Sequence, residues 1–291
     1  MIAVTRVLEG RPRDLGGFSV RRVLPAGGQQ TVGPFIFFDH MGPAIFAPGE
    51  GVDVRPHPHI GLATVTYLFE GEFMHRDSLG SAQLIRPGDV NWMVAGRGIA
   101  HSERTPPELR RAPAGAPIHG IQTWIALPTA HEETAPSFSH HPARDLPEIT
   151  GGGARLRLIA GEAYGARAPA EVFSPMFYLE AVLEDGATVE LPGHYEERAA
   201  YVVEGGIEVA GEHYAVGQMA VFAPAMPVTL RASGPARVML LGGAPLDGPR
   251  QIWWNFVSSS RERIERAKLD WREDRFAAVP GDPERIPLPE A

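Results

Sequence analysis

The pentapeptide YLFEG at residues 67–71 occurs a second time, with two substitutions, as YVVEG at residues 201–205. Each copy is followed by another glycine that marks a turn, Gly88 in the first half of the chain and Gly217 in the second. β-Branched and aromatic residues that end in a glycine are typical of a strand that runs into a tight turn. The recurrence therefore predicts two similar β-domains that arose by duplication.

The rest of the chain has the same short-strand character. Its 33 glycines and 28 prolines are scattered over 291 residues and separate apolar runs such as ATVTYLF, YVVEGGIEV and ARVMLLGG. Short strands joined by turns indicate an all-β sandwich or barrel, and this length can bury two cores of ordinary domain size. We expect domains at residues 1–140 and 141–291, with a Pro-, Gly-, Ser- and His-rich linker at 128–153.

One segment predicts a helix. Ser259 precedes it, Glu262 is placed to complete a capping box, and the apolar residues recur near helical spacing. These apolar residues are Ile264, Ala267 and Trp271. We expect this helix to pack on the second barrel, and residues 104–117 to form a long exposed loop.

Charge and composition exclude several classes of function. The formal net charge is −8, no Lys/Arg-rich run is present, and Arg110-Arg111 is too short to be a nucleic-acid patch, so nucleic acid and anionic membranes are poor partners. The chain has no apolar stretch near the roughly 20 residues that span a bilayer and no secretory signal pattern, so we expect a cytoplasmic protein. The absence of cysteine excludes disulfides and thiol nucleophiles and leaves nitrogen and oxygen as metal ligands.

Two short motifs predict a metal site. His57 and His59 lie two residues apart in DVRPHPH, and a strand's period of two sends both side chains to one face. His101 and Glu103 repeat this arrangement in GRGIAHSE. We expect two paired ligand strands, facing across a barrel, that bind one divalent metal ion. Three imidazoles and a carboxylate suit iron(II), manganese, nickel, copper or zinc.

The repeat allows the same positions to be found in the second half. The residues that match the four proposed ligands there are Leu191, Gly193, Leu230 and Ala232. None of them can bind a metal through its side chain. His194 lies one residue out of register, which in a strand points to the opposite face. We therefore expect the metal in the N-terminal barrel.

Structural roles are favoured over chemical ones for the other candidate residues. His75 lies in a turn-like HRDSLG segment, and Asp39-His40 precedes a Gly-Pro pair that favours an Asx-type turn. Trp92 and Met93 alternate along a strand, so one of them should line the cavity, although core packing accounts for both. Three further histidines lie in loop-like sequence and are expected to be solvated: His119, His140 and His141.

Several longer motifs resemble the pirin family, a branch of the bicupins. They are PHPHIG (56–61), HRDSLG (75–80), RPGDVNWMVAGRGIAHSE (86–103), GIQTW (120–124) and FVSSS (256–260). The resemblance covers nearly the whole chain and implies two tandem jelly-roll-like cupin barrels. It also implies iron in the N-terminal cupin, bound by the residues that match the family's H-x-H and H-x-E motifs: His57, His59, His101 and Glu103.

The resemblance implies more than one function. Some pirins resemble quercetin 2,3-dioxygenases, whereas others are metal-dependent transcriptional cofactors or interact with metabolic enzymes. We expect an Fe(II) dioxygenase that cleaves a flavonol such as quercetin with O2, in which Glu103 is both a weak ligand and the general base. The alternative is a regulatory protein whose metal state controls binding to a protein partner. Metal-assisted isomerisation or hydrolysis is a weaker third hypothesis, because the fold does not choose the chemistry.

Overall fold

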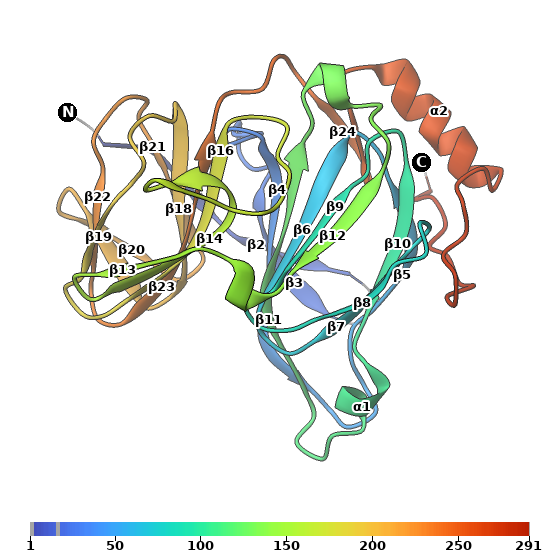
Figure 1. Ribbon diagram of the computed structural model, residues 1–291, viewed down its shortest axis with the longest axis horizontal. Helices are drawn as coiled ribbons and strands as arrows, with labels where there is room; N and C mark the ends of the chain where they lie inside the picture. Colours follow the sequence, from blue (N-terminus) through green and yellow to red (C-terminus); the bar gives the residue numbers. More distant parts are fainter. Residues whose placement is uncertain (1–2, 16–17, 291) are drawn as a thin grey trace. The chain divides into compact units, whose positions relative to one another are not determined.

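The computed structural model describes residues 3–15 and 18–290 and is built mostly of β-strands (Figure 1). The prediction of an all-β fold is therefore confirmed. The chain divides into two compact units. The N-terminal unit contains residues 14–20, 41–143 and 247–291, and the C-terminal unit contains residues 1–13, 21–40 and 144–246.

These units differ from the expected ranges 1–140 and 141–291 because segments near each end of the chain belong to the opposite unit. The first strand, β1 (Val4–Glu9), pairs antiparallel with β21 (Gln218–Phe222) in the C-terminal unit. The segment after residue 246 belongs to the N-terminal unit. The pairing with β1 covers a sheet edge that would otherwise expose unpaired backbone groups. The two paired strands lie too far apart in sequence for local patterns to predict that they are neighbours.

The N-terminal unit contains strands in two hydrogen-bonded orders, β12-β9-β6-β11-β4 and β5-β10-β7-β8, and residues 35–40 of β4 belong to the C-terminal unit. Their bounds are β4 Phe35–Phe46, β5 Asp53–His59, β6 Leu62–Glu70, β7 Phe73–Asp77, β8 Ala82–Ile85, β9 Val90–Val94, β10 Ile99–Arg104, β11 Ala116–Ala126 and β12 Ser137–His141. An apolar cluster that includes Leu68, Phe73, Ile85 and Ile118 lies between the two sets of strands. Two short strands precede β4, namely β2 (Arg11–Asp14) and β3 (Ser19–Leu24).

The C-terminal unit repeats this plan with the orders β1-β21-β18-β23-β16-β14-β13 and β17-β22-β19-β20, and β15 pairs with β14. The bounds are β13 Glu148–Gly151, β14 Ala154–Ala163, β15 Ala166–Arg167, β16 Met176–Leu183, β17 Thr188–Glu190, β18 Glu197–Glu204, β19 Gly206–Val209, β20 Glu212–Ala215, β22 Thr229–Ala232 and β23 Ala236–Gly243. Leu191, Leu230 and Ala232 belong to its apolar core, and His194 is exposed.

The repeated pentapeptides occupy equivalent places, at the ends of β6 and β18. Gly71 and Gly205 have positive φ angles of 83° and 72°. A Cβ atom added at either glycine would lie 2.2 Å from a carbonyl oxygen, that of Pro117 or that of Pro235. Both turns therefore require glycine for the same reason: the backbone is left-handed and packs closely against a carbonyl group of another segment.

The predicted helix is α2 (Arg261–Arg272), but its first turn differs from the prediction. Its N-cap is Ser260, whose hydroxyl accepts a hydrogen bond of 3.2 Å from the Arg263 amide. Ser259 instead donates through its amide and its hydroxyl to the Glu132 carboxylate. Glu262 interacts with the Ser260 side chain, so the expected capping box is not formed.

The buried face of α2 is confirmed, whereas its predicted packing partner is wrong. The helix packs in the N-terminal unit, in a cluster formed by Ile60, Ala100, Phe256, Ile264, Ala267 and Trp271. Phe256 belongs to β25 (Phe256–Ser258), which pairs with β24 (Gln251–Trp253). Helical spacing predicts which face is apolar but not which surface covers it.

Two segments expected to be loop and linker contain regular structure. Residues 104–117 include the short helix α1 (Pro107–Arg110), and the Arg110 guanidinium donates to the Val52 carbonyl and the Asp53 carboxylate. Residues 128–153 contain β12, β13 and two 3-10 turns, Thr129–His131 and Ala143–Asp145. Among the described residues, no helix is long and apolar enough to cross a bilayer.

Candidate metal centre

The two ligand motifs lie on neighbouring strands. β5 and β10 pair antiparallel in one sheet, with His101 directly opposite His57 and a β-bulge between His101 and Glu103. The expected pairing of the two ligand strands is therefore confirmed. Residues opposite each other in an antiparallel pair point to the same side of the sheet, so this pairing also brings the imidazoles together.

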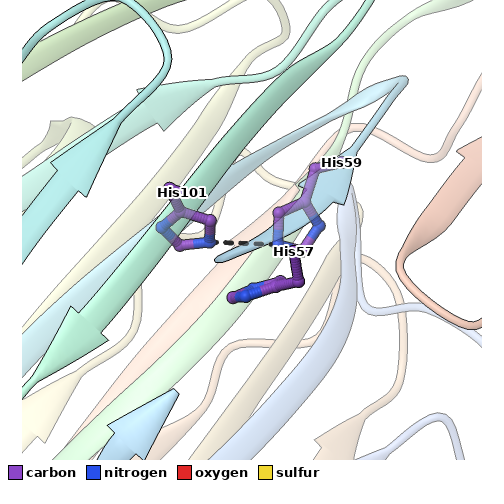
Figure 2. Close-up of side chains that lie close together, drawn as sticks. All are labelled: His57, His59 and His101. Carbon is purple, nitrogen blue, oxygen red and sulfur yellow. Dashed lines mark hydrogen bonds between the residues drawn. The ribbon is translucent and has the colours of Figure 1, made fainter. Parts of the chain in front are cut away.

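Three histidine rings meet in a buried cluster (Figure 2). Donor atoms of His57, His59 and His101 all lie within 4.8 Å of one another, and the Nε2 atoms of His59 and His101 are 3.1 Å apart. The exposed fractions are 7% for His57 and 1% for each of the other two. Such a spacing of nitrogen atoms is compatible with their binding one ion.

Backbone carbonyls orient two of the rings. His57 Nδ1 lies 2.9 Å from the Arg55 carbonyl oxygen, and His59 Nδ1 lies 3.0 Å from that of Asn255. A carbonyl oxygen can only accept, so each Nδ1 carries the hydrogen and each Nε2 keeps a lone pair. This is the form in which a neutral imidazole binds a metal.

The environment keeps the three imidazoles neutral. Burial lowers the pKa of His57 to about 4, and burial followed by neighbouring histidines lowers the pKa of His59 and of His101 well below the ordinary value. The Nε2 atoms of His59 and His101 are close enough, at 3.1 Å, for one cation to bind both when neither carries a hydrogen. The donor set therefore fits a divalent metal with nitrogen and oxygen ligands.

Glu103 lies in the same interior but groups with different histidines. Its carboxylate forms a second cluster of donor atoms within 4.8 Å, together with His75 and His101. Thr66 donates to Glu103 Oε1 at 2.7 Å, and Gln122 Nε2 lies 3.4 Å from Oε2. Burial raises the pKa of Glu103, while the hydrogen bond from Thr66 acts in the opposite direction. The structure thus contains two triads that share His101.

His75 is more closely connected to this centre than its turn-like sequence indicates. It lies on β7 and is 2% exposed. Its Nδ1 is 3.4 Å from His101 Nδ1, and its Nε2 is 3.0 Å from Asp77 Oδ2. The ring stacks on Phe138, with centroids 4.3 Å apart and planes inclined by 10°.

Sequence reasoning did not select Thr66 or Gln122. Both were visible in the quoted motifs, but no local pattern shows that β6 and β11 pair to place Gln122 opposite Thr66. Met93 pairs with Thr64, whereas Trp92 pairs with Val65, so Met93 shares the face of Thr64 and Thr66 and lies on the site side. The prediction that one of these two side chains faces the interior is consistent with this register.

Five other polar residues differ from their predictions. Asp39 and His40 lie in β4 and not in an Asx-type turn: Arg22 forms two hydrogen bonds with the Asp39 carboxylate, and His40 Nδ1 lies 2.8 Å from the Tyr201 hydroxyl. The histidines expected to be solvated are in strands. His119 is buried on β11, and the two on β12 are half-buried, His140 and His141.

Comparisons with known proteins agree on one family. The Pirin family model matches residues 17–125, and the model for the pirin C-terminal cupin domain matches residues 178–277. A pirin-like protein of Caulobacter vibrioides is 55% identical over 98% of this chain and 99% of its own length. Mouse pirin is 31% identical over 88% of this chain and 87% of its own length.

Solved structures show the same fold. A quercetin 2,3-dioxygenase from Acinetobacter baumannii superposes with a TM-score of 0.90 at 33% identity, covering 98% of this chain and 95% of that one. A bacterial pirin from Escherichia coli, solved in complex with nickel(II), superposes with a TM-score of 0.64 at 18% identity, covering 83% of this chain and 99% of that one. This chain belongs to the pirin family and is built of two cupin domains.

Proposed function

We propose that the protein is a metal-dependent dioxygenase that cleaves a flavonol such as quercetin with O2, using iron(II) held by His57, His59, His101 and Glu103. The observation that carries this proposal is the convergence of three buried imidazoles, each with a ring nitrogen within 4.8 Å of those of the other two. The 33% identity to a protein solved as a quercetin 2,3-dioxygenase supports the substrate class. Manganese, nickel, copper and zinc accept the same donors.

The four proposed ligands are all buried, but to different extents. Glu103 and His57 retain 6% and 7% exposure, compared with 1% for His59 and His101. Trp124 lies behind His59, with ring centroids 5.2 Å apart. We propose that a flat aromatic substrate approaches over His57 and Glu103, and that Trp124 and Met93 form part of its apolar surroundings.

Glu103 is the residue that accepts the proton of the substrate hydroxyl in this proposal. Its raised pKa makes it a better proton acceptor than an exposed carboxylate, and Thr66 and Gln122 hold it in place. The metal, when bound, supplies Lewis acidity towards that hydroxyl and redox chemistry towards O2. Overall, one flavonol and one O2 give the ring-opened ester and one carbon monoxide.

The first test is Glu103→Gln, which keeps the size of the side chain and removes its basicity. Quercetin cleavage per bound metal is expected to fall by roughly 10²-fold or more, the usual contribution of a general base. Glu72→Gln, at a partly exposed glutamate that pairs with Arg86, is the matched control. Undiminished cleavage by Glu103→Gln with its metal retained removes the base from the mechanism.

The reaction itself is tested by removing all metal, reloading anaerobically with iron(II) or another divalent ion, and following quercetin loss and carbon monoxide release in air. Turnover is expected with iron(II) and to be absent from the metal-free protein. Lack of turnover with every ion that binds stoichiometrically contradicts the enzymatic proposal.

A regulatory role is the second candidate, and one set of contacts favours it. Arg104 directly follows Glu103 and forms two hydrogen bonds of 2.8 Å with Asp282 in the C-terminal segment. The Ile286 amide donates to the Pro56 carbonyl, which precedes His57. Both ligand strands thus contact residues 282–286, through which the metal state can reach a surface that a protein partner reads.

A further inference from the structure

Behind His101 the N-terminal unit buries an aspartate–histidine pair that the proposed reaction does not use. Asp77 is 0% exposed and His75 is 2% exposed. We propose that Asp77 and His75 are positioning residues that hold His101 in the tautomer that leaves its Nε2 available to the metal. This inference rests on the proposed metal site and assigns that site two further residues.

The proposed chain of hydrogen bonds starts at Asp77. Its Oδ1 accepts hydrogen bonds from the amides of Leu79 and Ser81 at 2.9 and 3.0 Å, which fixes the carboxylate plane. Its Oδ2 lies 3.0 Å from His75 Nε2. A carboxylate can only accept, so His75 Nε2 carries the hydrogen, and in the neutral imidazole His75 Nδ1 then keeps a lone pair.

The second step transfers this constraint to the metal ligand. His75 Nδ1 faces His101 Nδ1 at 3.4 Å, and one of the two must carry a hydrogen for this contact to be attractive. Because His75 Nδ1 is the acceptor, His101 Nδ1 is the donor, and His101 Nε2 keeps its lone pair. This nitrogen lies 3.1 Å from His59 Nε2, and Figure 2 marks the contact between the two rings.

The ring of His75 is also held against rotation. Phe138, on β12, stacks almost parallel to it at a centroid distance of 4.3 Å. His57 and His59 are oriented by backbone carbonyls, whereas His101 is oriented by side chains that end in a carboxylate. A carboxylate behind an imidazole makes it a more basic ligand, and loss of such a partner typically weakens metal affinity about 10- to 100-fold.

The substitution Asp77→Asn tests this assignment because it keeps the shape of the side chain and reverses the direction of its hydrogen bond with His75. The amide oxygen can still accept from Leu79 and Ser81, which turns the NH2 group towards His75 Nε2. His75 must then carry its hydrogen on Nδ1, and His101 is driven to carry its own on Nε2, where the metal binds. We expect the Kd for zinc, measured by competition with a chelator, to rise roughly 10- to 100-fold with one equivalent still bound at saturation.

A direct readout that needs no activity is the long-range 1H–15N spectrum of the histidine rings. In the metal-free protein, the fraction of His101 protonated at Nδ1 is expected to be higher in the wild type than in Asp77→Asn, where the proton moves to Nε2. His75→Asn supplies rescue, because an asparagine oxygen close to the former Nδ1 position can still accept from His101, whereas His75→Leu cannot. Zinc affinity is expected near wild type in the first and weakened in the second.

Asp89→Asn is the matched control. Asp89 likewise accepts a backbone amide, that of Ala143 at 2.8 Å, and lies beside a histidine, His140 at 3.7 Å, but outside both metal triads. It should change neither zinc affinity nor the His101 tautomer. Unchanged affinity and tautomer in Asp77→Asn overturn the proposal, as does complete loss of zinc in His75→Asn, which would make His75 a ligand. If wild-type protein binds no metal, the proposed function fails, while the tautomer of metal-free His101 still tests the positioning role.

Discussion

At the scale of single residues, the candidate site depends on which nitrogen atom each ring presents. His57 and His59 direct Nε2 inward because carbonyl oxygens occupy the Nδ1 side. For His101 the corresponding partner is His75, a side chain 26 positions earlier in the sequence. The sequence predicts the proposed ligands through their spacing, but not these partners. Asn255 and His75 lie on other segments, and spacing does not show that the His57 ring turns towards Arg55.

The change His101→Ala is predicted to abolish stoichiometric metal binding, because this imidazole belongs to both triads. The fold should remain, since the apolar cluster around Leu68 and Phe73 closes the unit without the ion. Metal analysis together with circular dichroism checks both statements. His194→Ala, at an exposed histidine of the C-terminal unit, is the control. One equivalent of metal in purified His101→Ala refutes the ligand assignment.

At the scale of elements, strand pairing decides the geometry of the site. β5 and β10 each present two of the proposed ligands, and their antiparallel register places His57 opposite His101. β7 on the far side of β10 adds His75, which pairs with Glu103 across the strands. Helix α2 then covers Ile60 and Ala100, residues adjacent to His59 and His101, from outside the site.

Truncation of the α2 face is predicted to destabilise the N-terminal unit. Trp271 is 5% exposed, and its indole Nε1 donates to the Ile286 carbonyl at 2.9 Å. Trp271→Ala should lower the free energy of unfolding by about 3–5 kcal/mol, the usual cost of removing a large buried aromatic side chain. Leu269→Ala on the same helix, at a side chain 45% exposed, should change it by less than about 1 kcal/mol. Equal denaturant midpoints for the two variants contradict this packing.

At the scale of the whole molecule, the compact units do not follow the order of the chain. The N-terminal strand β1 completes a sheet of the C-terminal unit, and the last segment of the chain returns to the N-terminal unit. In that segment, Asp282 is 7% exposed and pairs with Arg104. A rigid metal site therefore has a direct connection to residues near the C-terminus.

Metal binding is predicted to slow amide hydrogen exchange in residues 279–290, because ordering of β10 restricts Arg104 and hence the ion pair with Asp282. Mass-spectrometric exchange of zinc-loaded and metal-free protein measures this. In Arg104→Gln, exchange of the segment should be faster and independent of zinc. Identical exchange in all three samples removes the structural support for metal-controlled partner binding.

The sequence alone determined the features that depend on local periodicity. A period of two placed His57 with His59 on one face, helical spacing identified the buried side of α2, and the repeated pentapeptide revealed two similar barrels. Tertiary structure decided which strands are neighbours, which unit α2 covers, and that His75, Thr66 and Gln122 join the site. These features depend on contacts between distant segments, which are selected by the total burial and hydrogen bonding of the folded chain and not by the residues adjacent in sequence.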